Sequence, residues 1–312
     1  MRHILTSEQF DRPFLEWLFQ QTDSLRTAFA KQQLGRPLDW SMLFTIFYEP
    51  STRTRISFEA GASHLGMRVV STENAREFSS GAKGETLEDT IRILCGYKPS
   101  VIVLRHFENG AAERAAKVST VPIINAGDGP GEHPTQALLD LYTIAREKGK
   151  IDGLTIVIGG DLAHGRTARS LAKLLAKFDD VQIIFVAPPR FRIGRDIKDY
   201  LKRHHAHFSE EIYMFPALAK ADVIYWTRIQ SERMMTWMPK FMRRWIAMLM
   251  QQPYIIGRTE LERIREDAIV LHPLPRVGEI TTEVDIDLRA AYFRQAENGM
   301  YVRMVLLDWV LQ

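Results

Sequence analysis

The chain has 312 residues, of which 46% are hydrophobic and 25% are charged, which is the composition of a soluble globular protein with room for two domains of ordinary size. The formal net charge is only +3, which argues against nucleic acid as the main partner. Cys95 is the single cysteine and no apolar run reaches the roughly 20 residues of a membrane span, so we expect no disulfide, no cysteine-built metal site, no membrane contact, no signal peptide and a cytoplasmic location.

Apolar segments of strand and helix length alternate through residues 1–149 and predict a first α/β domain. Asp11 is the expected N-cap of a helix over residues 13–31. A strand should follow at residues 42–47, and an amphipathic run at residues 56–65 predicts the next helix. The remaining expected elements are a strand at 68–71, a helix at 86–95, a strand at 101–104, a helix at 111–118 and a strand at 121–125.

The pattern pauses around Lys148-Gly149-Lys150 and restarts, which predicts a second α/β domain over residues 150–289. Its expected elements are strands at 154–158, 182–186, 223–226 and 269–271 and a helix at 165–178. The final segment, residues 290–312, predicts a helix that returns and packs on the first domain. The predicted fold class is therefore α/β, with two similar doubly wound parallel-sheet domains.

The most informative stretch is Phe47-Tyr48-Glu49-Pro50-Ser51-Thr52-Arg53-Thr54-Arg55, which joins a strand to a helix. Pro50 disfavours helical geometry in the residue before it, and Ser51 or Thr52 is a natural N-cap, so the helix should begin here with free backbone N–H groups. Hydroxyl and guanidinium groups at such a helix end suit a phosphate group. The same pattern also suits an ordinary capped helix with surface arginines.

This stretch closely resembles the carbamoyl phosphate signature of the transcarbamoylases, the aspartate/ornithine carbamoyltransferase superfamily. Arg105, at the end of an expected strand, and His133-Pro134-Thr135-Gln136, in the glycine-rich loop of residues 126–136, match further positions of that family's pocket. The resemblance implies that carbamoyl phosphate is bound by Ser51, Thr52, Arg53, Thr54, Arg105, His133, Gln136, Leu274 and Pro275. It implies that the catalytic groups are Arg53, Thr54, Lys83, Arg105 and His133.

The family also implies a division of labour within this pocket. Ser51, Thr52, Arg53 and Arg105 would face the phosphoryl oxygens. Thr54, Arg105 and His133 would donate hydrogen bonds to the carbonyl oxygen, whose negative charge grows during attack. The carbonyl group of Leu274, in a cis bond to Pro275, would accept a hydrogen bond from the carbamoyl nitrogen.

Two loops of the second domain, residues 161–167 and 227–233, resemble the aspartate branch of the family. Two carboxylates demand two cationic groups, whereas ornithine would require an acidic partner for its distal amine. Arg166 resembles the residue that holds the α-carboxylate, and Arg228 with Gln230 resembles the pair that holds the side-chain carboxylate. The motif at residues 272–276 lacks the cysteine of the ornithine branch. The implied aspartate-binding residues are Lys83, Arg105, Arg166, Arg228, Gln230 and Leu274.

Residues 77–85 are small and polar with two glycines, a composition typical of a mobile loop. They match the family loop that reaches into the neighbouring subunit's active site with Ser79 and Lys83, which implies a homotrimer with shared sites. Without the resemblance, Lys83 would be read as an ordinary solvated lysine.

Two other segments relate to motion and assembly. Glu49, Arg166 and Arg233 match an ion cluster that stabilises the closed state in relatives. Residues 234–252 are longer and richer in Met and Trp than the corresponding loop of familiar members. They have the spacing of an amphipathic helix, which we expect to pack in the core or against another subunit rather than on a membrane.

The resemblance covers nearly the whole chain and implies transfer of a carbamoyl group from carbamoyl phosphate to the amino group of L-aspartate, giving N-carbamoyl-L-aspartate and phosphate in pyrimidine biosynthesis. It implies no metal and no cofactor, and it leaves open a regulatory subunit or another pyrimidine enzyme as a partner. Three alternatives stand beside it. They are a transcarbamoylase for another amino-acid acceptor, a non-catalytic paralogue, and a dinucleotide-dependent dehydrogenase, although Gly159, Gly160 and Gly165 do not fit the Gly-x-Gly-x-x-Gly spacing.

Overall fold

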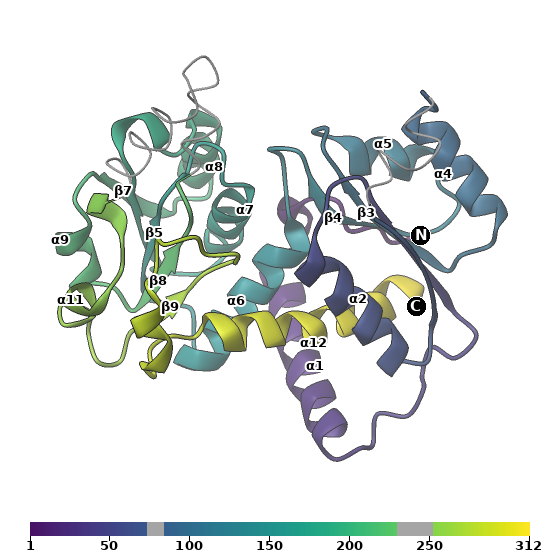
Figure 1. The fold of residues 1–312 in the computed structure, drawn as a ribbon, viewed down its shortest axis with the longest axis horizontal. Coiled ribbons are helices and arrows are strands. Elements are labelled where there is room, and N and C mark those ends of the chain that lie inside the picture. Colours follow the sequence, from purple (N-terminus) through teal and green to yellow (C-terminus); the bar gives the residue numbers. More distant parts are fainter. Residues whose placement is uncertain (74–83, 230–251) are drawn as a thin grey trace. The chain divides into compact units, whose positions relative to one another are not determined.

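The computed structural model describes residues 1–73, 84–229 and 252–312 (Figure 1). These residues form two compact units, one made of residues 1–142 and 296–312 and the other of residues 143–295. The division falls within two helices, α6 (Pro134–Lys148) and α12 (Tyr292–Leu311). The chain therefore leaves the first unit within α6 and re-enters it within the first part of α12.

The first unit contains a four-stranded parallel sheet in the order β2-β1-β3-β4. Its strands are β1 (Met42–Phe47), β2 (Arg68–Thr72), β3 (Val101–His106) and β4 (Ile123–Asp128). Its other complete elements are a 3₁₀ turn η1 (Ser7–Gln9) and the helices α1 (Arg12–Ala30), α2 (Thr52–His64), α4 (Leu87–Gly96) and α5 (Ala111–Val118). Parallel strands need crossover connections, and α2 and α5 provide two of them.

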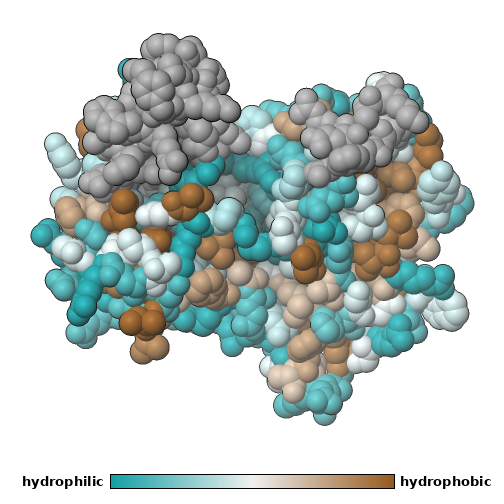
Figure 2. Space-filling view, viewed as in Figure 1, coloured by the Kyte–Doolittle hydropathy of each residue, from teal (hydrophilic) through white to brown (hydrophobic). Residues whose placement is uncertain are grey.

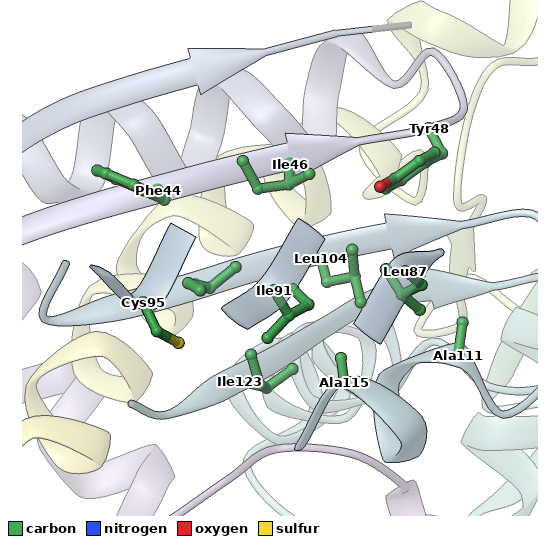
Figure 3. Close-up of a cluster of buried hydrophobic side chains, with 11 residues drawn as sticks. Phe44, Ile46, Tyr48, Leu87, Ile91, Cys95, Leu104, Ala111, Ala115 and Ile123 are labelled. Carbon is green, nitrogen blue, oxygen red and sulfur yellow. The ribbon is translucent and has the colours of Figure 1, made fainter. Parts of the chain in front are cut away.

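Alternate side chains of β1 face opposite layers of this unit. Phe44 and Ile46 lie in a buried cluster with Ile91 of α4 and Ala115 of α5, so these two helices cover one face of the sheet (Figure 3). Thr45, between them, donates a hydrogen bond from its hydroxyl to the carboxylate of Glu59 on α2, at 2.8 Å. Helix α2 therefore covers the opposite face, which fixes the direction in which its N-terminus points relative to the strand ends.

Local capping explains where two of these helices begin. Asp11 accepts a hydrogen bond from the backbone N–H of Phe14, at 2.9 Å, at the start of α1. Thr86 accepts one from Asp89, at 3.2 Å, at the start of α4. Each cap satisfies one of the backbone donors that a helix leaves unpaired in its first turn.

The second unit contains a five-stranded parallel sheet in the order β7-β6-β5-β8-β9. Its strands are β5 (Thr155–Gly159), β6 (Gln182–Val186), β7 (His207–Glu211), β8 (Val223–Trp226) and β9 (Ile269–Leu271). Its helices are α7 (Arg166–Leu175), α8 (Arg195–Arg203), α9 (Met214–Leu218) and α11 (Arg258–Leu261), with 3₁₀ turns η3 (Pro189–Phe191), η5 (Gln252–Tyr254) and η6 (Thr282–Ile286). The central strands β5 and β8 are almost wholly buried, as expected for strands covered on both faces.

The predicted α/β class with two parallel sheets is confirmed. Several predicted elements have the observed bounds, among them β1, α5, β6, β8 and β9. Strand β7 was not predicted, because its sequence His-Phe-Ser-Glu-Glu is polar and its side chains alternate between exposed and half-buried at the sheet edge. Strand β4 begins two residues later than predicted and continues through Asp128, since the apolar run gives way to polar residues that are nevertheless buried.

Hydrophobic residues on the face drawn in Figure 2 occur in separate groups among hydrophilic ones. Such scattered apolar exposure is usual for a globular protein surface. None of the described helices combines the length and the apolar character that crossing a bilayer requires. Within residues 1–73, 84–229 and 252–312, no cluster of three His, Cys, Asp or Glu side chains has an arrangement suited to a metal ion.

Candidate active site

Each sheet contains a point at which the strand order reverses. In the first unit the chain places β2 on one side of β1 and β3 on the other, so the reversal lies between β1 and β3. In the second unit β6 and β7 lie on one side of β5 while β8 and β9 lie on the other. Loops at the carboxyl ends of strands beside such a point are where open α/β sheets bind their ligands. The sequence-predicted site residues Glu49 to Thr54, Arg105, Arg166 and Arg228 all follow or end these four strands.

The N-terminus of α2 has the donors of an anion site. Ser51 is the N-cap residue, and its side chain makes no capping hydrogen bond to the helix. Thr52 and Arg53 are exposed on the first turn. Partial loss of hydration around the Arg53 guanidinium lowers its pKa from the usual value, yet an arginine remains protonated at neutral pH. Backbone N–H groups, hydroxyls and a cation therefore lie together at the positive end of the helix.

Arg53 and Arg55 have different surroundings, although only one residue separates them. Arg55 donates hydrogen bonds to the carboxylate of Glu59, at 3.3 Å, and to that of Glu73, at 3.1 Å. No hydrogen bond or ion pair of Arg53 is present within the described part of the chain. The structure thus assigns Arg55 to holding the loop after β2 against α2, and it leaves the Arg53 guanidinium available to a ligand.

Thr54 and His133 are brought together from distant parts of the sequence. The Oγ1 atom of Thr54 lies 3.5 Å from the Nε2 atom of His133, and both residues are buried. His133 immediately precedes α6, where its carbonyl oxygen accepts hydrogen bonds from the backbone N–H groups of Gln136 and Ala137. These bonds fix the backbone of His133 at the helix start and direct its ring toward α2.

Arg105 is at the end of β3, beside the end of β1. Its guanidinium donates to the carbonyl oxygen of Ala126, at 3.1 Å, and its Nη2 atom lies 3.6 Å from the carboxylate of Glu49. The Arg105 side chain is 14% exposed, whereas that of Glu49 is 35% exposed. The Arg105 guanidinium is thus held at the carboxyl end of β3 by the backbone carbonyl of Ala126 and by the more exposed carboxylate of Glu49.

Gln136 lies one turn into α6 and is buried. Its amide nitrogen donates to the Oδ1 atom of Asp140, at 2.8 Å, inside the first unit. This bond requires the NH₂ group of the Gln136 amide to point toward Asp140, so a residue of the same helix sets the orientation of the amide. Sequence reasoning selected Gln136 but did not identify the carboxylate that orients it.

The loop of residues 126–136 has an organising residue that sequence reasoning also missed. The carboxylate of Asp128 accepts hydrogen bonds from the backbone N–H groups of Gly110 and Glu132, both at 2.9 Å. Gly129 has a φ of +47°, and a Cβ there would lie 2.6 Å from the carbonyl oxygen of Phe107. An aspartate among glycines is a typical turn signal, so its role could have been inferred from the sequence.

The two glycines at the end of β5 are explained by packing against β8 and the residue after it. A Cβ on Gly159 would lie 2.1 Å from the ring of Trp226, and one on Gly160, whose φ is +112°, would lie 2.1 Å from the carbonyl oxygen of Thr227. Thr227 donates hydrogen bonds to Gly159 from both its N–H and its hydroxyl, at 2.8 and 2.9 Å. These contacts lock together the two strand ends that precede Arg166 and Arg228, without any nucleotide-binding turn.

Arg166 and Arg228 emerge from adjacent strands of the second unit. Arg166 is the first residue of α7, and Arg228 is two residues beyond β8, in which Trp226 pairs with Gly159 of β5. Between β5 and α7, the buried carboxylate of Asp161 accepts hydrogen bonds from the backbone and ring N–H groups of His164, at 3.0 and 3.1 Å. This bond closes the loop that ends at Arg166.

The motif after β9 is held by a buried pair. His272 donates from Nε2 to the carboxylate of Glu279, at 2.8 Å, and its Nδ1 atom accepts the backbone N–H of Leu274, also at 2.8 Å. Burial alone would raise the pKa of Glu279, but the hydrogen bonds from His272 and from backbone N–H groups hold it below its usual value. The Leu274–Pro275 bond is cis, as the family resemblance implied, and Leu274 has a φ of +52°. The loop backbone is therefore fixed through the imidazole.

The last residue of the same motif is also anchored. Both outer nitrogens of Arg276 donate to the carboxylate of Asp285, and one also donates to the hydroxyl of Tyr292, at 3.0 Å. This contact ties the loop after β9 to the start of α12. Sequence reasoning listed Arg276 within the motif but assigned it no partner.

Some predicted site residues lie outside the part of the chain that the structure describes. These are Ser79 and Lys83 in the first unit's loop, Gln230 and Arg233 after β8, and the segment 234–252 apart from its last residue. Glu49 and Arg166 belong to different units, and their interaction with Arg233 stays a prediction.

Comparison with known proteins assigns a relationship to both units. The family model described as aspartate/ornithine carbamoyltransferase, carbamoyl-P binding domain, matches residues 2–146, and the Asp/Orn binding domain of the same family matches residues 152–310. The chain is 50% identical over 308 residues to the chloroplastic aspartate carbamoyltransferase of Arabidopsis thaliana, covering 99% of this chain and 77% of that protein.

Solved structures give the same relationship. The catalytic subunit of M. jannaschii aspartate transcarbamoylase superposes with a TM-score of 0.89 at 40% identity, covering 99% of this chain and 98% of that one. Aspartate transcarbamoylase from Trypanosoma cruzi in complex with carbamoyl phosphate and aspartate superposes with a TM-score of 0.89 at 36% identity, covering 99% and 95% of the two chains.

Proposed function

The chain belongs to the aspartate/ornithine carbamoyltransferase family, and we propose that it transfers the carbamoyl group from carbamoyl phosphate to the amino group of L-aspartate. The products are N-carbamoyl-L-aspartate and phosphate, and the reaction belongs to pyrimidine biosynthesis. The observation that carries this proposal is the start of α2, where Arg53 is exposed at a helix N-terminus and Thr54 meets His133 in the interior. Relatives named for the same reaction support the choice of acceptor.

In the proposed complex the phosphoryl group lies at the N-terminus of α2. The backbone N–H groups and the hydroxyls of Ser51 and Thr52 donate to its oxygens, and the guanidinium groups of Arg53 and Arg105 neutralise its charge. The Arg105 guanidinium already lies 3.6 Å from the carboxylate of Glu49, so a phosphoryl group that binds Arg105 competes with that carboxylate. The exchange favours the phosphate because it brings the larger charge and three acceptor oxygens to the same cation.

The carbonyl group of the substrate then faces Thr54, Arg105 and His133. As the amine attacks, a tetrahedral intermediate forms and negative charge develops on the carbonyl oxygen, where preorganised donors are worth more than in water. His133 is buried, so little solvent competes for its ring. The C–O bond to phosphate breaks next, and the departing phosphate is a suitable acceptor for the amine proton. Gln136, Leu274 and Pro275 complete the proposed carbamoyl phosphate contacts.

Aspartate recognition is assigned to the second unit. Arg166 holds the α-carboxylate, Arg228 and Gln230 hold the side-chain carboxylate, and Leu274, Lys83 and Arg105 complete the set. Because β5 and β8 are paired neighbours, Arg166 and Arg228 emerge from one edge of one sheet, which suits a ligand with two carboxylates a few ångströms apart. Another amino-acid acceptor is the alternative, and it would have to present two anionic groups to the same arginines.

We further propose that the active protein is a homotrimer in which Ser79 and Lys83 act in the site of the neighbouring subunit. Mixing an inactive Lys83→Ala variant with an inactive Arg53→Ala variant tests this arrangement. If sites are shared, mixed trimers contain some sites with both residues intact and activity returns. Activity that stays absent after subunit exchange, shown by mass spectrometry of mixed oligomers, would exclude shared sites.

Three further roles are part of the same proposal. Glu49, Arg166 and Arg233 stabilise the closed, substrate-bound state.

A regulatory subunit or another pyrimidine enzyme is the class of protein partner that the family resemblance suggests. The cytoplasm is the proposed location, while the Arabidopsis relative is named as chloroplastic, so cell fractionation with an antibody to this chain decides the compartment.

The decisive assay incubates the purified chain with carbamoyl phosphate and, in parallel, L-aspartate, L-ornithine or no acceptor. The carbamoylated amino acid is measured by mass spectrometry, because carbamoyl phosphate also decomposes to phosphate without an enzyme. Product with aspartate alone is the expected result. Product with ornithine alone, or with neither acceptor while carbamoyl phosphate still binds, would contradict the aspartate assignment.

A further inference from the structure

Arg303 is a charged residue in the interior of the first unit that none of the predicted site roles uses. It belongs to α12 and is 3% exposed. Its Nη1 atom donates a hydrogen bond to the hydroxyl of Ser57 on α2, at 2.9 Å. Its guanidinium carbon lies 5.2 Å from the centre of the Phe58 ring, within the range of a cation–π contact.

Two glycines allow α12 to pack closely against its neighbouring helices around Arg303. A Cβ on Gly61 of α2 would lie 2.8 Å from the side chain of Met304. A Cβ on Gly299 of α12 would lie 2.6 Å from the Nη1 atom of Arg303 and 3.0 Å from the side chain of Leu139 on α6. Helix α12 therefore approaches both α2 and α6 closely, at positions where any other residue would force the helices or the guanidinium to move.

The Arg303 charge has a buried counter-charge. Burial lowers the pKa of Arg303 to about 10, and the negative charge of Asp140 opposes that change, so the guanidinium remains protonated at neutral pH. Asp140, on α6, is fully buried. Charged groups in a protein interior persist only where they are paired and hydrogen-bonded. The arrangement is therefore specific in geometry as well as in charge.

The hydrogen bond of Arg303 to Ser57 and its charge interaction with Asp140 both lead to carbamoyl phosphate residues. The Ser57 hydroxyl donates to the carbonyl oxygen of Thr54, at 3.0 Å, one turn from the start of α2. Asp140 accepts the amide N–H of Gln136, at 2.8 Å, one turn from the start of α6. Through the side chain of Arg303, α12 thus interacts with both helices whose N-termini carry the candidate site.

We propose that Arg303 is a positioning residue that sets the spacing between the N-termini of α2 and α6, so that Thr54, His133 and Gln136 converge on one carbamoyl phosphate. It acts through Ser57 and Asp140 and does not touch the substrate. This inference rests on the proposed function and adds to it a determinant that lies in the C-terminal helix. Its loss should weaken the carbamoyl phosphate site selectively, because the residues that bind aspartate lie mostly in the other unit.

The test compares Arg303→Met with Arg26→Met as a matched control. Arg26 also links a helix of the first unit to α12, since it donates to Asn298 at 2.8 Å and lies 4.4 Å from the Tyr301 ring, but it contacts neither Ser57 nor Asp140. Both variants are checked for folding by circular dichroism and for oligomeric state by light scattering. Their kcat and their KM values for carbamoyl phosphate and aspartate are then measured, together with inorganic phosphate binding by calorimetry.

Arg303→Met should lower kcat/KM for carbamoyl phosphate by about tenfold to a hundredfold, the effect expected when site groups are displaced by about 1 Å, and should change the KM for aspartate little. Arg26→Met should leave both values near those of the parent chain. Parent-like constants in Arg303→Met, or equal losses for both substrates and in both variants, would overturn the proposal and indicate a purely structural contact.

If Arg303→Met does not fold, Ser57→Ala and Asp140→Asn replace it, since the first removes the hydrogen bond, the second removes the counter-charge, and both retain the arginine. A carbamoyl phosphate KM equal to the parent value in both variants would then overturn the proposal. The parent chain separates this outcome from failure of the proposed function. A parent that carbamoylates nothing refutes the function, while calorimetric phosphate binding by the parent and the variants still tests the positioning role.

Discussion

The Nε2 atom of His133 lies 3.5 Å from the Oγ1 atom of Thr54, across 79 residues of sequence. This distance is at the long end of hydrogen bonding, and such contacts in ligand-free enzymes often tighten when substrate binds. Both side chains are buried. Thr54 lies in the first turn of α2 and His133 immediately precedes α6, so the two helix N-termini face the same region of the first unit. The pair therefore marks the point at which a carbonyl oxygen would receive two donors.

We expect His133→Ala to lower kcat by about a hundredfold to a thousandfold, which is the usual cost of removing one donor to a developing oxyanion. Carbamoyl phosphate binding should change less, because the donors to the phosphoryl group remain. Steady-state kinetics and calorimetry measure the two effects separately. The matched control is His207→Ala, in the exposed edge strand β7, which should retain parent kinetics. A kcat for His133→Ala within a factor of about three of the parent would contradict the assigned role.

Arg53 and Arg55 should respond in opposite ways to the same substitution. Arg53→Gln should reduce kcat/KM for carbamoyl phosphate by at least about a hundredfold and leave thermal stability unchanged, since the guanidinium has no protein partner in the described residues. Arg55→Gln should instead lower stability by about 1 kcal/mol, because it breaks partly buried pairs with Glu59 and Glu73. Kinetics and urea unfolding of both variants test this. The assignment fails if the two effects are exchanged.

Arg228→Ala should chiefly weaken aspartate. We expect its KM for aspartate to rise about a hundredfold, the cost of leaving one carboxylate without its charged hydrogen-bond partner, while calorimetric binding of carbamoyl phosphate stays at the parent value. Arg190→Ala, an exposed arginine of the same unit, is the control. Equal aspartate KM values in Arg228→Ala and the parent would show that another residue holds the side-chain carboxylate.

The pair of Glu279 and His272 predicts a pH dependence of stability. The folded-state pKa of Glu279 lies below the ordinary value for a glutamate, so its ionised form stabilises the fold at neutral pH. This stabilisation should be lost as pH falls from about 4.5 through the lower folded-state pKa. Urea unfolding of the parent and Glu279→Gln at pH 7 and at decreasing acidic pH measures it. The stability difference between them should shrink with falling pH, whereas exposed Glu262→Gln should show little difference at any pH. A difference that is constant with pH would refute the assignment.

Sequence reasoning located most of the strands and the residues at their ends, because buried strands such as β8 are short apolar runs with a polar residue immediately after. The N-cap of α1 was also readable, since Asp11 precedes an amphipathic run, and Thr86 was predicted to begin the helix that it caps in the structure. The cis bond before Pro275 came from the family resemblance and is confirmed. The local sequence pattern was enough to predict an element wherever that segment alone determines its structure.

Contacts between distant segments were beyond that reasoning. Gln136 and Asp140 are four residues apart on α6, a spacing at which helical side chains meet, but nothing near them in the sequence indicates that Arg303, far along the chain, supplies the counter-charge. Likewise, within the described part of the chain Arg55 is paired and Arg53 is not, partly because of Glu73, which the fold brings close to α2 from the end of β2. Such pairings follow from the order of strands and the crossing of helices, which single-segment patterns do not contain.

Strands β5, β8 and β9 are hydrogen-bonded neighbours, and each is followed by one of the loops to which we assign acceptor binding. The strand interiors are fixed by packing, whereas exposed residues in the loops beyond them are less constrained, so mutation there can explore new acceptors without endangering the fold. The freedom is uneven. Gly159 and Gly160 cannot gain side chains against Trp226 and Thr227, so the loop after β5 can change little near the strand. A lineage that acquires a new amino-acid acceptor should therefore accumulate its changes after β8 and β9 first, and should retain this pair of glycines.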